Sequence, residues 1–194
     1  MKKLTRADLW SLEAYAERRK DFRAQVLEHK KNRAVKLGEH VTLLFEDRLT
    51  VQYQIQEMLR VERIFEAEGI EDELAAYNPL IPDGANLKAT MLIEYGEVEE
   101  RRQALAQLIG IEDRTWMRVA GCEPVLAIAD EDLERENEEK TSSVHFLRFE
   151  FTPPMIAAAK AGASLSVGVD HPHYSATVQA LPEPVQVALT ADFD

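Results

Sequence analysis

Hydrophobic positions in the first third of the chain recur with the period of an α-helix. The residues that keep this spacing are Leu9, Leu12, Ala16, Phe22 and Val26. They predict a helix from Arg6 to about Lys31, in one piece or in two pieces that meet near residues 19–21. Thr5 and Asp8 have the spacing of a capping pair, which places the start of this helix at Arg6.

A hairpin and two more helices come next. Ala34–Leu37 and His40–Phe45 have strand character and flank a Gly-Glu dipeptide that suits a tight turn. Arg48–Glu68 keeps helical spacing, and Gly69 is placed to cap its C-terminus. Ile70–Tyr77 predicts a third, shorter helix.

The pattern changes from helical to alternating beyond Asn78–Gly84, a segment with two prolines and a glycine. The predicted strands are Ala89–Tyr95, Thr115–Val119, Val125–Ala129, Val144–Phe151, Ser164–Val169 and Ser175–Ala180. The predicted helices among them are Glu97–Ile109, Pro153–Ala161 and Pro184–Ala191. Strands linked by two to five residues must pair antiparallel, because a parallel crossover needs about a dozen residues.

The sequence therefore predicts an α+β fold, in which a helical N-terminal part packs against a mainly antiparallel sheet with additional helices. The break in pattern divides the chain into residues 1–84, mainly helical with a short hairpin, and residues 85–194, an antiparallel sheet with packed helices. One continuous domain is the alternative. A chain of 194 residues is long enough for either arrangement.

A charged residue interrupts the apolar face of the predicted helix Arg48–Glu68. The apolar residues that gather on this face, at about 100° per residue, are Val51, Ile55, Met58, Val61 and Phe65. Glu62 falls within the same arc. Burying a bare carboxylate is costly, so we expect Glu62 to meet a cation, a metal ion or a proton.

The opposite side of this helix carries a line of polar residues, which predicts a helix packed on both sides. Glu57 and Arg60 are spaced to pair with each other or to clamp a polar ligand. The candidate ligand-binding residues are Glu46, Arg48, Tyr53, Glu57, Arg60 and Glu62. Two interpretations stay open: an internal salt-bridge network that fixes helix packing, or a pocket for a small polar molecule or a metal ion.

Histidines add a second candidate chemistry. His171 and His173 would project to the same side of a strand, but Pro172 between them favours a turn with incidental histidines. A metal site of hard oxygen ligands and imidazoles would favour iron or manganese, with zinc as a third metal. Its predicted ligands are Glu57, Glu62, His40 and His171.

Charge and composition exclude several classes of protein. A net charge of −12 argues against non-specific binding to nucleic acid or to anionic membranes. The chain has no apolar run near the roughly 18 residues of a membrane span and no signal-peptide pattern at its start, which predicts a soluble, cytoplasmic protein. The single cysteine, Cys122, excludes an intrachain disulfide, and its predicted turn favours an incidental thiol.

Common enzyme signatures are also missing. The chain has no glycine-rich phosphate loop, nucleophile elbow, His-Glu-x-x-His motif or dinucleotide fingerprint, so whether it is an enzyme stays open. The acidic segment Asp130–Lys140 lacks the central glycine of a calcium loop, and Thr141 stands where the bidentate glutamate is needed. We interpret it as a solvated loop.

Several motifs carry a resemblance that covers nearly the whole chain. They are residues 4–9 (LTRADL), 45–50 (FEDRLT), 54–60 (QIQEMLR) with Glu62, 77–82 (YNPLIP), and His171-Pro172 with Tyr174. They resemble a bacterial family known only as a domain of unknown function. Genes of that family tend to lie beside those for rubrerythrin-like diiron proteins and iron–sulfur oxidoreductase subunits. The resemblance implies a role in redox or peroxide-stress metabolism and assigns no catalytic residue.

Three hypotheses follow from the residues and the resemblance. The first is an accessory protein of a bacterial redox system that binds a protein partner, such as an oxidoreductase or diiron protein, or a small polar ligand. Its acidic surface would suit a partner with a basic docking face. The second is a metal-binding protein or metalloenzyme with glutamate and histidine ligands. The third is a structural subunit of a homodimer or larger homo-oligomer.

Overall fold

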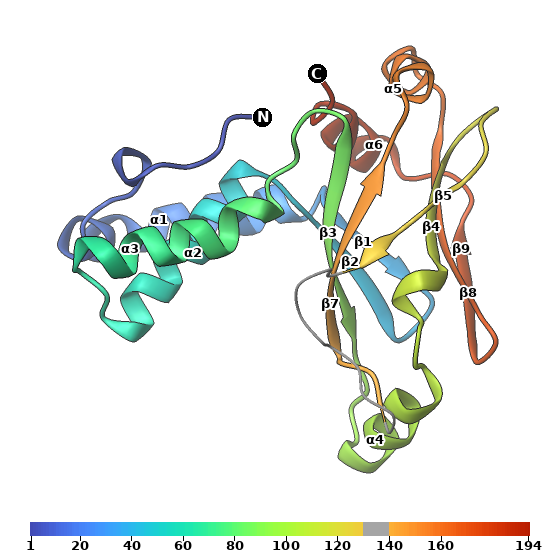
Figure 1. Cartoon of the computed structure of the whole chain (residues 1–194), viewed down its shortest axis with the longest axis horizontal. Helices are drawn as coiled ribbons and strands as arrows, with labels where there is room; N and C mark the ends of the chain where they lie inside the picture. The colour runs from blue at the N-terminus through green and yellow to red at the C-terminus, as the bar shows by residue number, and fades with distance from the viewer. Residues whose placement is uncertain (130–139) are drawn as a thin grey trace.

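The computed structural model describes residues 1–129 and 140–194, and it confirms the α+β class. Helices near the N-terminus form one layer, and two antiparallel sheets lie beside it (Figure 1). The acidic segment for which a solvated loop was predicted lies outside the described residues, except for Lys140. Among the described residues, no helix combines the length and hydropathy needed to span a membrane.

The helical layer contains three α-helices and two short 3-10 turns. Its elements are η1 (Arg6–Asp8), α1 (Leu12–Lys30), α2 (Arg48–Glu62), α3 (Ala67–Tyr77) and η2 (Asn78–Leu80). The capping pair of Thr5 and Asp8 forms, with the Asp8 carboxylate 2.8 Å from the Thr5 amide, but it closes only the turn η1. The first α-helix begins at Leu12, where the Ser11 hydroxyl caps it, and is continuous through residues 19–21.

The second helix is shorter than the periodicity predicts. It ends at Glu62 because Arg63 adopts a left-handed conformation with φ of 58°, which stops helical propagation. The prediction that Gly69 caps this helix is wrong, since Gly69 lies inside α3. Gly69 instead allows the Ile64 side chain to pack closely against α3, because a Cβ at Gly69 would lie 2.8 Å from Ile64 Cγ2.

Two sheets make up the rest of the fold. Sheet A has the order β1-β2-β3-β7-β6 and sheet B the order β5-β4-β8-β9, with every pairing antiparallel. The strands are β1 (Ala34–Leu37), β2 (Val41–Glu46), β3 (Asn86–Ile93), β4 (Thr115–Val119), β5 (Val125–Leu126), β6 (Ile128–Ala129), β7 (Val144–Glu150), β8 (Leu165–His171) and β9 (Tyr174–Val178). The connecting helices are α4 (Val98–Gln107), η3 (Glu112–Arg114), α5 (Pro153–Lys160) and α6 (Glu183–Thr190).

Strand β2 belongs to the first part of the predicted domain division and β3 to the second. They pair over six residues, from Val41 opposite Ile93 to Glu46 opposite Lys88. The hairpin of β1 and β2 thus completes a sheet whose other strands come from residues 86–150. The division into residues 1–84 and 85–194 stays a prediction, and this pairing joins its two parts through backbone hydrogen bonds.

The single strand predicted at Val125–Ala129 is two strands that belong to different sheets. Strand β5 pairs with β4 in sheet B, whereas β6 pairs with β7 in sheet A. Ala127 between them is 7% exposed, and its amide donates to the Thr115 carbonyl at 2.8 Å. The chain therefore crosses from one sheet to the other at this residue.

The opposite edges of the two sheets meet through Tyr174 on β9. Its hydroxyl donates to the Leu37 carbonyl at the end of β1 and accepts from the His40 amide at 3.1 Å. Gly38, in the turn between β1 and β2, has φ of 69°, and a Cβ there would lie 2.6 Å from the Tyr174 hydroxyl. Glycine is thus required both by the backbone conformation and by the approach of the tyrosine.

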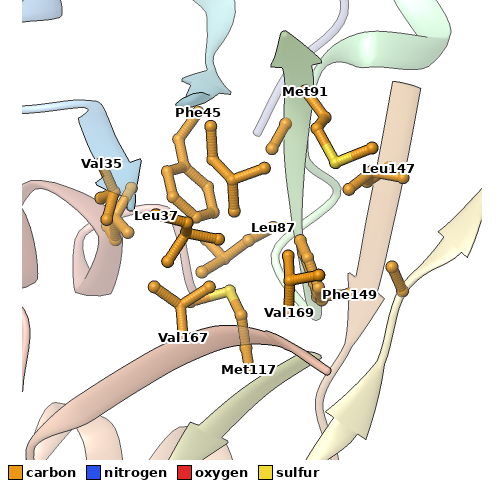
Figure 2. Packing of buried hydrophobic residues seen from close by; sticks show 14 of the residues in the cluster. Val35, Leu37, Phe45, Leu87, Met91, Met117, Leu147, Phe149, Val167 and Val169 are labelled. Atoms are coloured by element: carbon orange, nitrogen blue, oxygen red, sulfur yellow. The ribbon is translucent and has the colours of Figure 1, made fainter. Parts of the chain in front are cut away.

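The main hydrophobic core lies between the two sheets (Figure 2). Leu37, Leu87 and Phe149 from sheet A face Met117 and Val167 from sheet B, and each of these side chains is fully buried. Alternation along the strands produces this packing, since the inward residues of β4 are buried while their neighbours face outward. A separate cluster fills the helical layer around Val51, Ile55 and Leu59 of α2.

Replacing Tyr174 with Phe should lower the free energy of unfolding by about 1–2 kcal/mol, because backbone groups at the edge of β1 lose their partner. Urea denaturation measures the change. Tyr77→Phe is the matched control, since within the described part of the chain the Tyr77 hydroxyl makes no hydrogen bond. Equal losses in the two variants would show that the Tyr174 hydroxyl does not stabilise the edge.

Candidate functional site

Glu57 is the centre of a polar cluster between α1 and α2. Its carboxylate accepts hydrogen bonds from the Tyr15 hydroxyl at 2.6 Å and from Nε and Nη2 of Arg19 at 2.7 and 2.8 Å. Arg60, the predicted partner, is more distant, with Nε 3.8 Å from Oε1 of Glu57. The main ion pair of Glu57 is therefore the bidentate pair with Arg19, which joins α1 to α2, and not the pair with Arg60 along α2.

The partners of Glu57 hold its carboxyl group ionised. The Arg19 hydrogen bonds, assisted by the Tyr15 hydroxyl, lower the pKa of Glu57 from 4.5 to about 2. Burial and the neighbouring Glu57 raise the pKa of Tyr15 above its ordinary value. A carboxylate with such a low pKa and with both oxygens engaged is poorly suited to proton transfer near neutral pH.

The other predicted ligand-binding residues lie in different surroundings. Glu46, at the end of β2, accepts from the hydroxyls of Thr50 at 2.6 Å and Thr90 at 2.7 Å. Arg48 pairs with Asp8 at 2.5 Å. The ring of Tyr53 packs near Phe22, with Lys30 Nζ 5.7 Å from its centroid. The structure thus distributes these side chains over separate contacts.

Glu62 is exposed, so the expectation of a carboxylate buried on an apolar face is wrong. The buried face of α2 is formed by Val51, Ile55 and Leu59, each no more than 2% exposed. Because the helix ends at Glu62, the predicted stripe does not continue, and Val61 at its last turn is 65% exposed. The α2 helix is nevertheless packed on both sides, by α1 and by α3.

The four predicted metal ligands also have separate partners. Glu57 is bound by Arg19, and Glu62 lies at the end of α2. His40 stacks on Tyr95, with ring centroids 3.9 Å apart. His171 is buried at the end of β8, where Nε2 lies 3.0 Å from the Ile109 carbonyl. Among the described residues, no group of three or more histidine, cysteine, aspartate or glutamate side chains is arranged to hold a metal ion.

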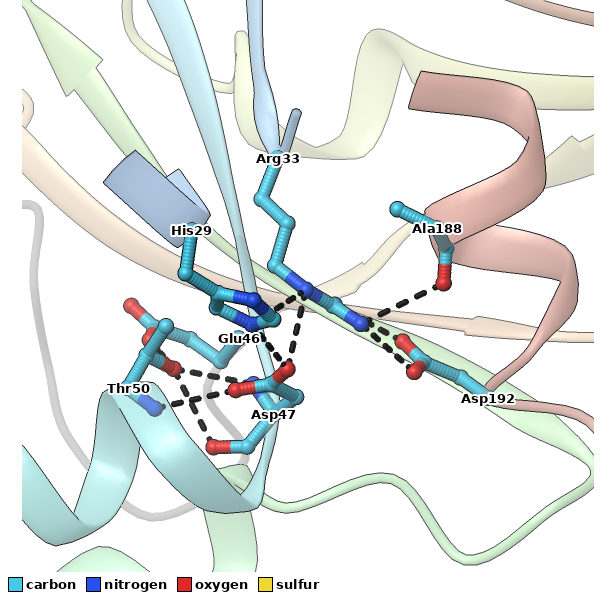
Figure 3. A network of polar contacts seen from close by, with 7 residues as sticks. All are labelled: His29, Arg33, Glu46, Asp47, Thr50, Ala188 and Asp192. Atoms are coloured by element: carbon cyan, nitrogen blue, oxygen red, sulfur yellow. Dashed lines mark hydrogen bonds and ion pairs between the residues drawn. The ribbon is translucent and has the colours of Figure 1, made fainter. Parts of the chain in front are cut away.

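A buried network around Arg33 was not predicted (Figure 3). Arg33, just after α1, is 4% exposed, and its guanidinium makes two hydrogen bonds to Asp192, at 2.7 and 2.9 Å. Its Nε lies 2.9 Å from Oδ2 of Asp47, which is also 2.5 Å from His29 Nε2. Arg33 Nε also donates to His29 Nε2 at 3.1 Å, so the guanidinium, the imidazole and the Asp47 carboxylate lie in mutual contact. Asp192 is 159 residues from Arg33 in the sequence, so no local pattern could predict this pair. The four-residue spacing of His29 and Arg33 was the one part of the network that the sequence could have indicated.

Burial and ion pairing act in opposite directions within this network. Burial raises the pKa of Asp192, whereas the hydrogen bonds and charge of Arg33 lower it. The guanidinium remains charged, because Asp192 and Asp47 more than offset the cost of its burial and raise its pKa. The network joins the end of α1, the start of α2 and the C-terminal segment after α6, which gives it a structural role.

An apolar pocket of about 210 Å³ lies at the end of the helical layer, and we call it the Trp10 pocket. Most of its lining is apolar, and two polar residues complete it: Leu9, Trp10, Leu12, Leu59, Ile64, Phe65 and Ile70, with Arg6 and Ser11. Phe65, in the turn between α2 and α3, is 67% exposed. Val61, in the last turn of α2, is 65% exposed.

By its fold, the chain is an α+β protein with a helical layer and two facing antiparallel sheets. A family model described as "Protein of unknown function (DUF3501)" matches residues 3–193, and the chain belongs to this family. The crystal structure of a protein of unknown function from Burkholderia pseudomallei K96243 is similar to it, with 55% sequence identity, complete coverage of both chains and a TM-score of 0.95. A search of curated proteins finds no match.

Glu57→Gln should lower the free energy of unfolding by about 1–3 kcal/mol at pH 7. The folded-state pKa of about 2 lies below the ordinary 4.5, so the stabilisation is complete above pH 4.5 and is lost as pH falls toward 2. The difference between wild type and variant should therefore shrink in acid. Urea denaturation between pH 7 and pH 3 tests this, with the exposed Glu62→Gln as control. A difference independent of pH would contradict the ionised pair.

Arg33→Met should cost about 3–5 kcal/mol, because Asp192 would remain buried without its cation. The double variant Arg33→Met/Asp192→Leu should recover part of the loss. Arg23→Met, on the exposed side of α1, serves as the control and should be nearly neutral. Guanidinium denaturation distinguishes these cases, and a double variant no more stable than the single one would argue against an uncompensated carboxylate.

Proposed function

We propose that this protein is an accessory protein of a bacterial redox or peroxide-stress system, and that it acts by binding a protein partner at the Trp10 pocket. The proposed docking surface consists of the pocket and the two exposed apolar side chains Val61 and Phe65, which we call its apolar edge. The exposure of Phe65, at 67%, is the observation that carries the proposal. Large exposed apolar side chains beside a pocket are typical of protein-interaction sites.

The size of the pocket supports a side-chain anchor as its occupant. Its volume of about 210 Å³ is below the roughly 300–1,000 Å³ of drug-sized ligand sites. Trp10 and Phe65 offer flat apolar area to an aliphatic or aromatic side chain of a partner. A partner that inserts such an anchor would cover both Val61 and Phe65.

The charge around the docking surface favours a basic partner. At the end of α2 and along α3, the exposed carboxylates outnumber the two exposed arginines, Arg60 and Arg63; they are Glu62, Glu66, Glu68, Glu71 and Asp72. Burial, followed by repulsion from Glu62 and Asp72, raises the pKa of the neighbouring Glu73. Lysine or arginine side chains around an apolar anchor would relieve this repulsion and guide association.

The redox context rests on the family resemblance and on the gene neighbours that it implies. These neighbours make an iron–sulfur oxidoreductase subunit or a rubrerythrin-like diiron protein the proposed partner. The metal-binding alternative has no comparable support, because within the described part of the chain Glu57, His40 and His171 each have a different partner. The homo-oligomer alternative would use the same apolar edge and is decided by the same experiment.

Phe65→Asp should abolish partner binding, because it places a charge at the centre of the apolar edge. Tagged wild type and variant are used to capture proteins from native lysate, and the captured proteins are identified by mass spectrometry. Binding of an oxidoreductase or diiron protein to wild type, lost in the variant, is expected. Val98→Asp on α4 is the matched control, since Val98 is 69% exposed and lies outside the docking surface.

Light scattering of the same samples separates the alternatives. A monomeric wild type is expected if the surface serves another protein. A wild-type dimer that dissociates in Phe65→Asp, with no oxidoreductase or diiron protein captured, would overturn the proposal in favour of a homo-oligomer. Capture that is unchanged by Phe65→Asp would show that the partner binds elsewhere.

A further inference from the structure

A second pocket lies on the outward face of sheet B. It shares no residue with the docking surface, and its chemistry is different. It has a volume of about 290 Å³ and is lined by Arg114, Trp116, Arg118, Pro124, Leu126 and Asp170. None of these residues lines the Trp10 pocket, and none was a candidate in the sequence. The pocket places two arginines and a tryptophan together on a protein of net charge −12.

Strand alternation explains why these side chains face outward. Thr115, Met117 and Val119 of β4 are buried in the core, so Trp116 and Arg118 project from the opposite face. Leu126 of β5 lies directly across from Trp116 in the sheet and is 60% exposed. The core-facing residues thus hold the outward side chains in a fixed register.

Gly168 of β8 is the neighbour that allows the indole to lie close to the sheet. It pairs with Trp116 on the adjacent strand, and a Cβ at this position would lie 2.5 Å from Cζ2 and 2.8 Å from Cε2 of Trp116. Any larger residue would displace the ring. The indole ring therefore packs directly against the backbone of Gly168, which holds the ring in a position where a ligand ring could stack on it.

Two guanidinium groups in this pocket are available to an anion. Arg118 Cζ lies 5.8 Å from the Trp116 ring centroid, within the range of a cation–π contact. Among residues 1–129 and 140–194, the side chains of Arg114 and Arg118 make no hydrogen bond or ion pair. By contrast, Arg19, Arg33 and Arg48 all bind carboxylates.

We propose that this pocket, the Trp116 site, binds a small anion that carries a flat ring. The ring would stack on Trp116, and Arg114 and Arg118 would bind the carboxylate or phosphate, for which their forked donors are suited. Asp170 would accept a hydrogen bond from an amino or hydroxyl group of the ligand. The volume of about 290 Å³ lies just below the roughly 300 Å³ at which drug-sized sites begin, so the ligand would be compact and large cofactors would not fit.

Two kinds of molecule share this chemistry, an aromatic carboxylate and a mononucleotide. Tryptophan fluorescence distinguishes them, because the chain has only two tryptophans. Wild type is titrated with benzoate, adenosine monophosphate and inorganic phosphate, each to about 10 mM, a range that detects Kd values on the order of 1 mM. Subtracting the signal of Trp116→Phe, in which only Trp10 remains, isolates the response of the site.

A saturable change with benzoate or adenosine monophosphate, at least tenfold tighter than with phosphate, is expected, and the stronger of the two identifies the ligand class. Arg118→Gln should weaken this binding at least tenfold, whereas Arg101→Gln on α4 should leave it unchanged. Isothermal titration calorimetry of wild type and both arginine variants gives a readout that is independent of the indole.

Three results would overturn the proposal. Phosphate binding as tightly as either ring-bearing anion would mean that the ring makes no contact with Trp116. Equal effects of Arg118→Gln and Arg101→Gln would reduce the interaction to general charge attraction. No saturable response to any of the three probes, by fluorescence and by calorimetry, would exclude the site. These outcomes are independent of partner capture, so this proposal and the docking proposal can fail separately.

Discussion

Arg33 carries its charge in the interior, between two carboxylates that belong to distant parts of the chain. Asp47 caps the start of the second helix, and Asp192 is the third residue from the end of the sequence. Neither carboxylate could be buried alone at tolerable cost, and neither could the guanidinium. The three groups therefore require one another. Their mutual dependence fixes the helical layer, through α1 and α2, against the sheet and the last helix.

This arrangement leaves two faces of the molecule with distinct chemistry. At the end of the helical layer, apolar side chains are exposed beside a row of carboxylates on α3. On sheet B, a tryptophan shares a pocket with two arginines whose side chains make no ion pair within the part of the chain that the structure describes. In each case the scaffold behind the face is rigid, because buried residues of the same elements fill a core. A rigid support lowers the entropy that a surface must lose when it binds.

Local patterns predicted most of the elements and little of the polar network. Strand β4 has its predicted bounds, because inward residues alternate strictly from Thr115 to Val119. Periodicity extended α2 too far, since it could not register the left-handed turn at Arg63. It also treated Val125–Ala129 as one strand, although the two halves pair in different sheets.

The partners of charged residues were beyond the reach of the sequence pattern. Glu57 meets Arg19 from a helix 38 residues earlier, and Arg33 meets Asp192 from 159 residues later. Helical spacing predicted Arg60 as the partner of Glu57, because a periodic pattern relates only residues of the same helix. The Trp116 site was hidden for a similar reason, since its residues come from three strands and the turns beside them.

The crossing of the chain at Ala127 and the Tyr174 hydroxyl act on opposite edges of the sandwich. The Ala127 crossing connects β5 to β6 through the backbone, and the Tyr174 hydroxyl joins β9 to the end of β1. Neither sheet can open at an edge without disturbing its neighbour. We therefore expect the amide protons of both sheets to exchange through one shared opening reaction, as a single cooperative unit with a common protection free energy.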